Sequence, residues 1–197
     1  MAYSIVVIGT SWGGLAALTA LLGDLPEDFS VPVVVVQHRS KNAEQLLGRL
    51  LQDATALKVC EVEDKDSLSP GTVYIAPSDY HMLIEAGHVS LTTEQPVRFS
   101  RPSIDVTFAS AADTYGRETI GVVLTGANED GASGLRHIIQ RGGHGLVQDP
   151  KTAEIPIMPL AAIRAAPTAE VLPLDRIAPR LVELTLDPSN AGRRRAV

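Results

Sequence analysis

The chain has 197 residues, of which 45% are hydrophobic and 20% are charged, and it carries a formal net charge of −6 at pH 7. This size and composition favour one well-packed globular domain, and the negative charge argues against nucleic acid or direct membrane insertion, which need a basic face or a long apolar segment. We expect a cytoplasmic protein for two reasons. No Lys or Arg precedes Arg39, whereas a signal peptide would need a positive charge near its start, and the single Cys60 cannot form an internal disulfide.

Strand-like runs alternate with helical patterns along the whole chain. Most of these runs are continuously apolar, which is typical of a parallel sheet covered on both faces. We expect strands at residues 5–8, 31–37, 58–62, 73–76, 120–124 and 145–148, and helices around residues 15–23, 46–51, 104–115, 135–139, 160–165 and 177–184. The leucine stripes of the first two helices, at residues 15, 18 and 22 and at residues 46, 47, 50 and 51, predict buried faces.

Two short strands within residues 81–91 predict an antiparallel hairpin, and residues 92–103 form a polar loop that would overhang a site. The alternation of strands and helices predicts the α/β class, as a three-layer, doubly wound and mostly parallel sheet with that small hairpin. The domain is expected to span residues 1–186. A disordered tail is expected at residues 187–197, where the composition turns to Pro, Ser, Asn, Gly and three arginines.

The turn after the first strand, Gly9-Thr10-Ser11-Trp12-Gly13-Gly14, offers three interpretations. A dinucleotide fingerprint would need glycine in place of Ser11, and a phosphate-binding P-loop would need lysine in place of Leu15. The pattern G-x-S-x-G matches the turn that presents a nucleophilic serine. The alternative is that Ser11 merely caps the following helix.

Two more strand ends carry candidate partners for Ser11. His38 follows the second strand, and Asp130 follows the strand at residues 120–124, with Glu129 as a rival carboxylate. Asp130 alternatively caps the helix from Ala132. Because the carboxyl ends of neighbouring parallel strands line one crevice, the three residues predict a serine hydrolase in which His38 is the base and Asp130 orients it. Their order along the chain differs from that of the α/β-hydrolases, which indicates convergent geometry.

Several ordered motifs, over about Ser4 to Leu184, make the chain resemble the catalytic domain of the bacterial chemotaxis protein-glutamate methylesterases. The motifs are Ile8-Gly9-Thr10-Ser11-Trp12-Gly13-Gly14, Gln37-His38, Pro70-Gly71, Tyr74-Ile75-Ala76-Pro77, His81-Met82, Arg101-Pro102-Ser103-Ile104-Asp105, Leu124-Thr125-Gly126, Asp130-Gly131, Gln148-Asp149 and Met158-Pro159. The resemblance implies hydrolysis of glutamate methyl esters, and deamidation of certain glutamines, on the cytoplasmic helices of methyl-accepting chemoreceptors. It implies no cofactor and no metal. The regulatory receiver domain of the family is absent from this sequence.

By this resemblance, Ser11 attacks the ester, His38 moves the proton and Asp130 holds the imidazole. The backbone N–H of Ala127 would bind the oxyanion, with the N–H of Trp12 as a second, generic candidate.

The chain departs from the family's pattern at Trp12, at Arg39 and at Asn128. Trp12 would wall the pocket or stack on substrate, and Arg39 would meet acidic residues of the receptor, unless both are surface packing. Asn128 stands where the family has a glycine and would tolerate a positive φ.

Arg98 and Arg101, in the overhanging loop, are further candidates for binding an acidic receptor helix. Alternative functions are a serine esterase acting on another methylated protein or a small ester, and a catalytically silent receptor-binding module.

Overall fold

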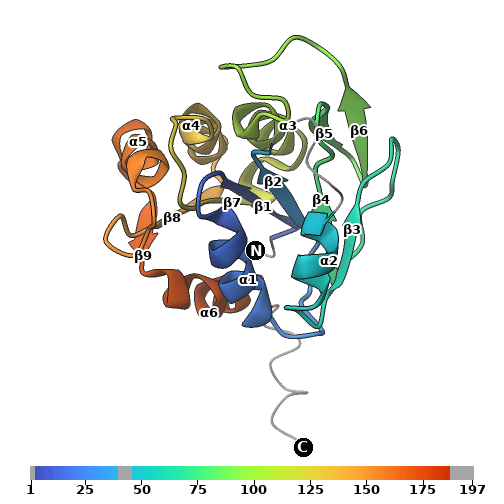
Figure 1. Cartoon of the computed structure of the whole chain (residues 1–197), viewed down its shortest axis with the longest axis horizontal. Helices are drawn as coiled ribbons and strands as arrows, with labels where there is room; N and C mark the ends of the chain where they lie inside the picture. Colours follow the sequence, from blue (N-terminus) through green and yellow to red (C-terminus); the bar gives the residue numbers. More distant parts are fainter. Residues whose placement is uncertain (1–2, 40–45, 187–197) are drawn as a thin grey trace, which may run out of the picture.

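A seven-stranded sheet, in which every pair of neighbouring strands is parallel, divides the structure into two helical layers (Figure 1). The computed structural model describes residues 3–39 and 46–186. The strand order is β3-β4-β2-β1-β7-β8-β9. The strands are β1 (Ile5–Thr10), β2 (Val33–Gln37), β3 (Lys58–Glu61), β4 (Thr72–Ile75), β7 (Thr119–Val123), β8 (His144–Gln148) and β9 (Glu170–Leu172). The predicted fold class, including the hairpin of β5 (His81–Glu85) and β6 (His88–Thr92), is confirmed.

The helices are α1 (Gly14–Gly23), α2 (Leu46–Gln52), α3 (Ile104–Tyr115), α4 (Ala132–Gln140), α5 (Ile157–Ala165) and α6 (Leu174–Thr185), with a single 3-10 turn, η1 (Gly116–Glu118), after α3. Each predicted helix is present, but α5 and α6 begin three residues earlier than expected. Pro159 therefore lies within the first turn of α5, where its missing N–H costs no helical hydrogen bond. The edge strand β9 has three residues and was not predicted.

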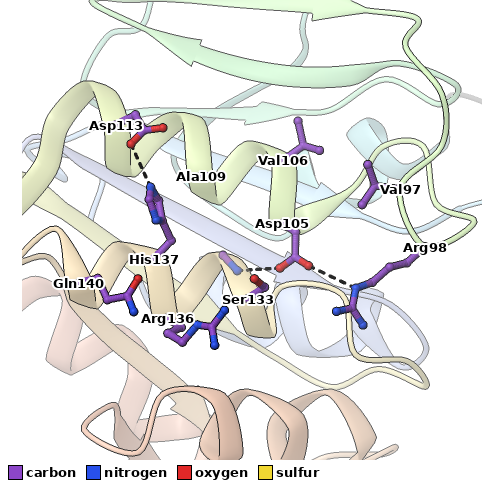
Figure 2. A pocket seen from close by; sticks show the side chains of 11 residues that line it. Val97, Arg98, Asp105, Val106, Ala109, Asp113, Ser133, Arg136, His137 and Gln140 are labelled. Atoms are coloured by element: carbon purple, nitrogen blue, oxygen red, sulfur yellow. Dashed lines mark hydrogen bonds and ion pairs between the residues drawn. The ribbon is translucent and has the colours of Figure 1, made fainter.

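The layer formed by α3, α4, α5 and the hairpin covers one face of the sheet. Helices α3 and α4 lie side by side (Figure 2). Their apolar faces pack on the sheet through fully buried side chains such as Phe108, Leu135 and Ile138, and Ile84 and Val89 of the hairpin join the same cluster. Each fully buried aliphatic or aromatic side chain of this kind stabilises the fold by roughly 1.5–3 kcal/mol.

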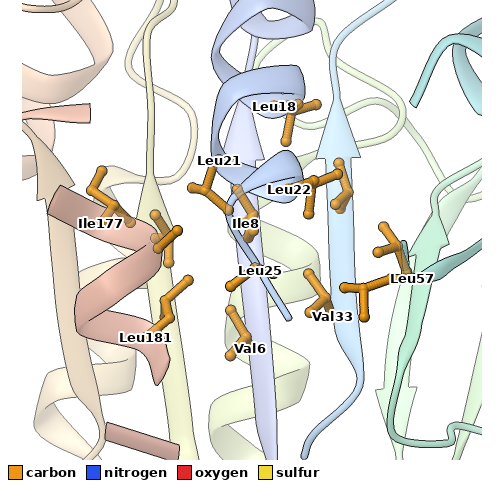
Figure 3. Close-up of a cluster of buried hydrophobic side chains, with 14 of the residues drawn as sticks. Val6, Ile8, Leu18, Leu21, Leu22, Leu25, Val33, Leu57, Ile177 and Leu181 are labelled. Carbon is orange, nitrogen blue, oxygen red and sulfur yellow. The ribbon is translucent and has the colours of Figure 1, made fainter. Parts of the chain in front are cut away.

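The opposite face of the sheet is covered by α1, α2 and α6 (Figure 3). Leu18 and Leu22 of α1 are fully buried there, as predicted, but Leu15 at the start of α1 is 39% exposed. In α2 only Leu51 is buried, whereas Leu46 and Leu50 are exposed. The prediction that the leucine stripe of α2 forms a wholly buried face was thus wrong, because this two-turn helix lies at the periphery of the layer.

Strand β1 is the pivot of the sheet, because β2 pairs with one of its edges and β7 with the other. The chain runs from β1 to β2 on one side and later returns to β7 on the opposite side, which makes the β1/β7 boundary the topological switch point of the sheet. Ligands of open α/β sheets bind outside the carboxyl ends of strands at such a point. The residues that follow β1, β2 and β7 are therefore placed together by the topology.

The described helices include none that is long and apolar enough to cross a membrane. The tail expected at residues 187–197 lies outside the described residues, so its disorder and the domain boundary at residue 186 stay predictions.

Candidate active site

The three strand ends are joined by hydrogen bonds made close to the sheet. The backbone N–H of Ser11, after β1, donates to the carbonyl of Thr125, after β7, at 3.0 Å, and the hydroxyl of Thr10 donates to the same carbonyl at 2.8 Å. On the other side, the backbone N–H of His38 donates to the carbonyl of Thr10 at 3.1 Å. The backbone therefore holds the Ser11, His38 and Thr125 loops in a fixed arrangement.

Ser11 sits in a tight turn that leaves its hydroxyl free. The position before α1 is taken by Gly13, with φ of 77° and no side-chain capping bond, so the alternative that Ser11 caps the helix does not describe the structure. The backbone carbonyl of Ser11 accepts hydrogen bonds from the N–H of Gly14 at 3.0 Å and from the side-chain amide of Gln37 at 2.8 Å. Within the described part of the chain, the Ser11 hydroxyl has no hydrogen-bond partner.

His38 and Asp130 form a direct pair. Nε2 of His38 lies 2.8 Å from Oδ2 of Asp130, and the two side chains are 12% and 0% exposed. Nδ1 of His38, the other ring nitrogen, lies 3.1 Å from the side-chain amide nitrogen of Asn128. The rival carboxylate, Glu129, is exposed and faces Arg98 and Arg164 instead.

Asp130 also caps a helix, though not the one expected from sequence. Its carboxylate accepts hydrogen bonds from the backbone N–H groups of Ile104 at 2.7 Å and Asp105 at 3.0 Å, which open α3, and from the Ser103 hydroxyl at 2.9 Å. Ser103 does occupy the capping position of α3, as predicted, but its hydroxyl binds Asp130 rather than the helix. The position before α4 belongs to Gly131.

Asp105 makes the reciprocal contact. From the first turn of α3, its Oδ1 accepts hydrogen bonds from the backbone N–H groups of Gly131 at 2.9 Å and Gly134 at 2.7 Å at the start of α4. The start of α3 is thus capped by Asp130, from the loop before α4, and the start of α4 is capped by Asp105, from α3. Carboxylates at helix N-termini satisfy the unpaired N–H groups and the positive end of the helix dipole.

The two buried carboxylates have pKa shifts of opposite sign. Burial acts to raise the pKa of Asp130, but the hydrogen bonds from His38 and from the backbone of Asp105 and Ile104 outweigh it, so this pKa lies below its ordinary value. For Asp105, burial prevails over the hydrogen bonds from Gly134 and Gly131, and the nearby negative charge of Asp130 adds to it, so its pKa is raised. Asp130 is therefore the carboxylate that stays ionised beside the imidazole.

The two backbone N–H groups predicted to bind an oxyanion are without hydrogen-bond acceptors among the described residues. Neither the N–H of Trp12 nor that of Ala127 donates a hydrogen bond to any of the described residues, and these are the two groups predicted from sequence for this role. Asn128 does not have a positive φ, so the explanation proposed for it from sequence does not apply. Its side chain is instead used for hydrogen bonding, to Asp130 and His38.

Two of the predicted substrate-binding residues, Trp12 and Arg39, differ in side-chain exposure and in hydrogen bonding. Trp12 is 66% exposed, and its indole N–H donates to Glu154 at 3.1 Å, so the ring lies on the surface beside the Ser11 turn, and its role as a pocket wall stays a prediction. The Arg39 side chain is only 8% exposed and binds Glu61 at 2.6 Å and the carbonyl of Ala76 at 2.9 Å. This pairing favours the packing interpretation of Arg39 over a contact with receptor.

The two arginines of the overhanging loop have different surroundings. Arg101 binds Asp79 and the carbonyls of Thr93 and Glu94, and its side chain is 15% exposed, so it ties the loop down. Arg98 is 53% exposed, and its ion pairs with Asp105 and Glu129 are long, at 3.7 and 3.6 Å. Of the two, Arg98 is the one whose side chain stays largely exposed.

Among the hollows that adjoin these residues, two lie nearest to the sites discussed above. One of about 240 Å³ is lined by His38, Arg39, Arg101 and the loop at 96–102, with Phe99 fully exposed beside it. A larger groove of about 490 Å³ lies between α3 and α4, where Arg98 and Asp105 mark one end (Figure 2). The larger groove contains none of Ser11, His38 and Asp130, so size alone does not identify the reactive site.

Sequence reasoning missed two positioning residues. Gln37 donates its amide to the carbonyls of Ser11 and His38, and its place immediately before His38 at the end of a buried strand was the available signal. Asp105 lies at the end of the motif Arg101-Pro102-Ser103-Ile104-Asp105, but no role was predicted for it from sequence. An acidic residue in the first turn of a helix is a signal for capping. Among the described residues there is no group of three or more His, Cys, Asp or Glu side chains that would hold a metal.

Comparison with known proteins places this geometry in a family. The sequence matches the CheB methylesterase family over residues 6–181. It is 44% identical to a putative protein-glutamate methylesterase/protein-glutamine glutaminase of Leptospira interrogans, over 98% of this chain and 100% of that protein. It is 39% identical to the protein-glutamate methylesterase FrzG of Myxococcus xanthus over 92% of this chain, but spans only 54% of that relative's length.

Among solved structures, the crystal structure of the Thermotoga maritima CheB methylesterase catalytic domain superposes with a TM-score of 0.88 at 36% identity, covering 93% of this chain and 100% of that one. The family match, the full-length similarity to the Leptospira protein and the shared fold agree with one another. The chain belongs to the CheB methylesterase family.

Proposed function

We propose that this protein hydrolyses glutamate methyl esters on the cytoplasmic helices of methyl-accepting chemoreceptors, and deamidates glutamines there, with Ser11, His38 and Asp130 as its catalytic residues. The observation that carries the proposal is the His38–Asp130 pair at 2.8 Å, formed from the ends of β2 and β7, the two strands that flank the end of β1 where Ser11 has a free hydroxyl. The names of the relatives, protein-glutamate methylesterase and protein-glutamine glutaminase, supply the substrate class.

The first half of the reaction forms an acyl-enzyme. Because Nε2 of His38 is used by Asp130, Nδ1 is the ring nitrogen left to accept the Ser11 proton. As that proton moves, Ser11 Oγ bonds to the ester carbonyl carbon and the carbonyl oxygen becomes an oxyanion. The oxyanion collapses, the bond to the methoxy oxygen breaks, and the proton on Nδ1 passes to that oxygen, so methanol leaves.

The second half of the reaction restores the enzyme. Water gives a proton to Nδ1 of His38 and attacks the acyl carbon, and Ser11 Oγ leaves and takes the proton back, which releases a glutamate side chain. With a glutamine substrate the same steps release ammonia in place of methanol. Asp130 keeps its negative charge throughout and stabilises the imidazolium that forms in each half.

The free N–H groups of Trp12 and Ala127 support the oxyanion part of the proposal. They belong to the loops that follow β1 and β7, and the Ser11 N–H and the Thr10 hydroxyl join these two loops by donating to the carbonyl of Thr125. Donors held in place before the reaction lower the barrier most, and removal of one such donor typically costs about 10²–10³-fold in kcat.

The experiment that tests the proposal measures methanol released from receptor whose glutamates carry labelled methyl esters. Wild type is expected to release label, and Ser11→Ala is expected to be slower by about 10⁴-fold or more. Equal release by both proteins would overturn the role of Ser11. Turnover of small esters without release from receptor would identify a general esterase, and receptor binding without either activity would identify a silent binding module.

A second prediction concerns Arg98. Arg98→Ala is expected to raise KM for the receptor by roughly two- to fivefold, because an exposed charged contact contributes about 0.5–1 kcal/mol, and to leave kcat with a small ester unchanged. The matched control is Arg164→Ala, which removes another exposed arginine that pairs with Glu129. Equal KM values for the two variants would contradict a specific role for Arg98.

A further inference from the structure

The nitrogen of His38 that must act as base is already occupied by Asn128. Nδ2 of Asn128 lies 3.1 Å from Nδ1 of His38, and Oδ1 of Asn128 accepts a hydrogen bond of 3.1 Å from the backbone N–H of Asp130. Asn128 thus bridges the two partners of Ser11 from within the loop between β7 and α4. Neither contact was predicted from sequence.

The positions of the protons follow from the donors and acceptors. The backbone N–H of Asp130 can only donate, so the side-chain oxygen of Asn128 must face it and the side-chain nitrogen must face His38. Because an amide nitrogen can only donate, Nδ1 of His38 is the acceptor, and its other nitrogen carries the hydrogen that is donated to Asp130. Both ring nitrogens are satisfied in this arrangement.

Ser11 and Asn128 therefore require the same lone pair. A neutral imidazole offers a single in-plane acceptor site, and the Ser11 hydroxyl must donate to that site before it can lose its proton. Within the described residues the Ser11 hydroxyl has no hydrogen bond, whereas the Asn128 amide has this one. The resting site is thus arranged with the base engaged by a neighbour that is not the nucleophile.

We propose that Asn128 is a positioning residue that competes with Ser11 for Nδ1 of His38, so that the amide must leave this nitrogen before Ser11 is activated. The inference rests on the proposed function, since it assumes that Ser11 is the nucleophile and His38 its base. Asn128 follows Ala127, whose free N–H is the proposed oxyanion donor, so an ester that enters the site contacts the loop that carries the competing amide. Binding of substrate and release of the base are thereby linked through adjacent residues.

Two substitutions separate the amide's contact with His38 from its contact with the loop. In Asn128→Ser, the short hydroxyl still accepts from the Asp130 N–H, as serine does in local turns, but does not reach His38. Asn128→Ala removes both contacts. The matched control is Glu129→Gln, which alters the adjacent exposed residue, whose partners are Arg98 and Arg164.

The first measurement is the second-order rate at which an activated phosphonate labels Ser11. Loss of one competing hydrogen bond is expected to speed labelling of Asn128→Ser roughly three- to tenfold. Asn128→Ala is expected to gain less, because its loop loses the bond to Asp130, and Glu129→Gln is expected to match wild type. Labelling of Asn128→Ser at the wild-type rate or slower would overturn the proposal.

The second measurement is the ¹⁵N spectrum of the His38 imidazole at neutral pH. In wild type, the ¹⁵N signal of Nδ1 is expected to be that of an unprotonated nitrogen that accepts a hydrogen bond. In Asn128→Ser, this signal is expected to move toward the position of an unprotonated nitrogen that accepts no hydrogen bond. A purely structural role of Asn128 would leave this signal in place, and an unchanged signal would overturn the proposal.

These measurements need no receptor, so the two proposals fail separately. If wild type releases no methanol from receptor and Asn128→Ser is nevertheless labelled faster, the substrate is wrong and the competition stands. If methanol is released normally and Asn128→Ser is labelled no faster, the competition is wrong and the proposed function stands.

Discussion

Asp130→Asn is expected to lower kcat for ester hydrolysis by on the order of 10⁴-fold, as removal of the carboxylate does in serine hydrolases that use this arrangement. An asparagine amide donates to Nε2 of His38, which forces the ring hydrogen onto Nδ1 and so removes the base that Ser11 needs. The measurement is methanol release at neutral pH under saturating substrate. The control is Glu129→Gln, and an activity of Asp130→Asn within tenfold of wild type would contradict the assignment.

The same substitution is expected to reduce the free energy of unfolding by about 3 kcal/mol, because it removes a buried carboxylate that accepts several hydrogen bonds and sets an amide against the N–H groups that donate them. Those groups are the backbone donors of Ile104 and Asp105 at the start of α3. Urea unfolding of both proteins at neutral pH measures the difference. Glu129→Gln, at an exposed position, should stay within about 0.5 kcal/mol of wild type.

The stability difference should also depend on pH. The pKa of Asp130 is lower in the folded protein than the unfolded value of about 3.9, so its contribution is fully present above about pH 4 and is lost as the pH falls through the folded-state pKa. The gap between wild type and Asp130→Asn should therefore close under acid conditions. Asp105, whose pKa is raised by burial and also by the charge of Asp130, has the opposite dependence and so offsets a part of this change. A gap that stays constant down to low pH would contradict the capping role of Asp130.

Gly126→Ala is expected to lower activity by about 10²-fold and the free energy of unfolding by about 1–3 kcal/mol. A Cβ at this position would lie 1.9 Å from Sδ and 2.8 Å from Cγ of Met158, and 2.9 Å from Cβ of Ser11. The Met158 side chain has room to shift at a cost, but Ser11 is held by its hydrogen bonds to Thr125 and Gln37. In the proposed mechanism, displacement of Ser11 moves the nucleophile away from its base, His38.

The double variant with Gly126→Ala and Met158→Ala separates these two contacts. It should recover part of the lost stability and little of the lost activity, since the contact with Ser11 remains. Gly48→Ala, in α2, is the matched control, because its Cβ would meet nothing within 4 Å. That variant should gain about 0.5–1 kcal/mol, as alanine does over glycine inside a helix. Full activity of Gly126→Ala would show that the close approach to Ser11 is unimportant.

Continuous apolar runs predicted the sheet well, because buried parallel strands need apolar side chains on both faces. The meeting of Ser11, His38 and Asp130 at adjacent strand ends followed from that topology. Edge elements were harder to predict: β9 has only three residues, and α2 carries a leucine stripe whose burial depends on where the helix docks.

Contacts between loops could not be predicted from the sequence. The helix that Asp130 caps, the partner of Arg39 and the hydrogen bonds of Asn128 each depend on which loops fold against one another. Local patterns assign Asp130 to the helix that follows it in sequence, whereas in the structure the carboxylate faces α3, which precedes it in the chain. A residue's type and local spacing thus indicated its location, but its partner was set by the packing of distant segments.

The exchange of caps between α3 and α4 bears on how activity would be lost in evolution. Asp130 and Asp105 hold the start of two helices, so selection for a stable fold alone would keep both residues in a descendant that no longer hydrolyses esters. The Ser11 hydroxyl holds no other described residue in place, so under the proposed mechanism only selection for catalysis would preserve it. In a comparison of related sequences, a retained aspartate would therefore report an intact fold, and a retained serine would report a working enzyme.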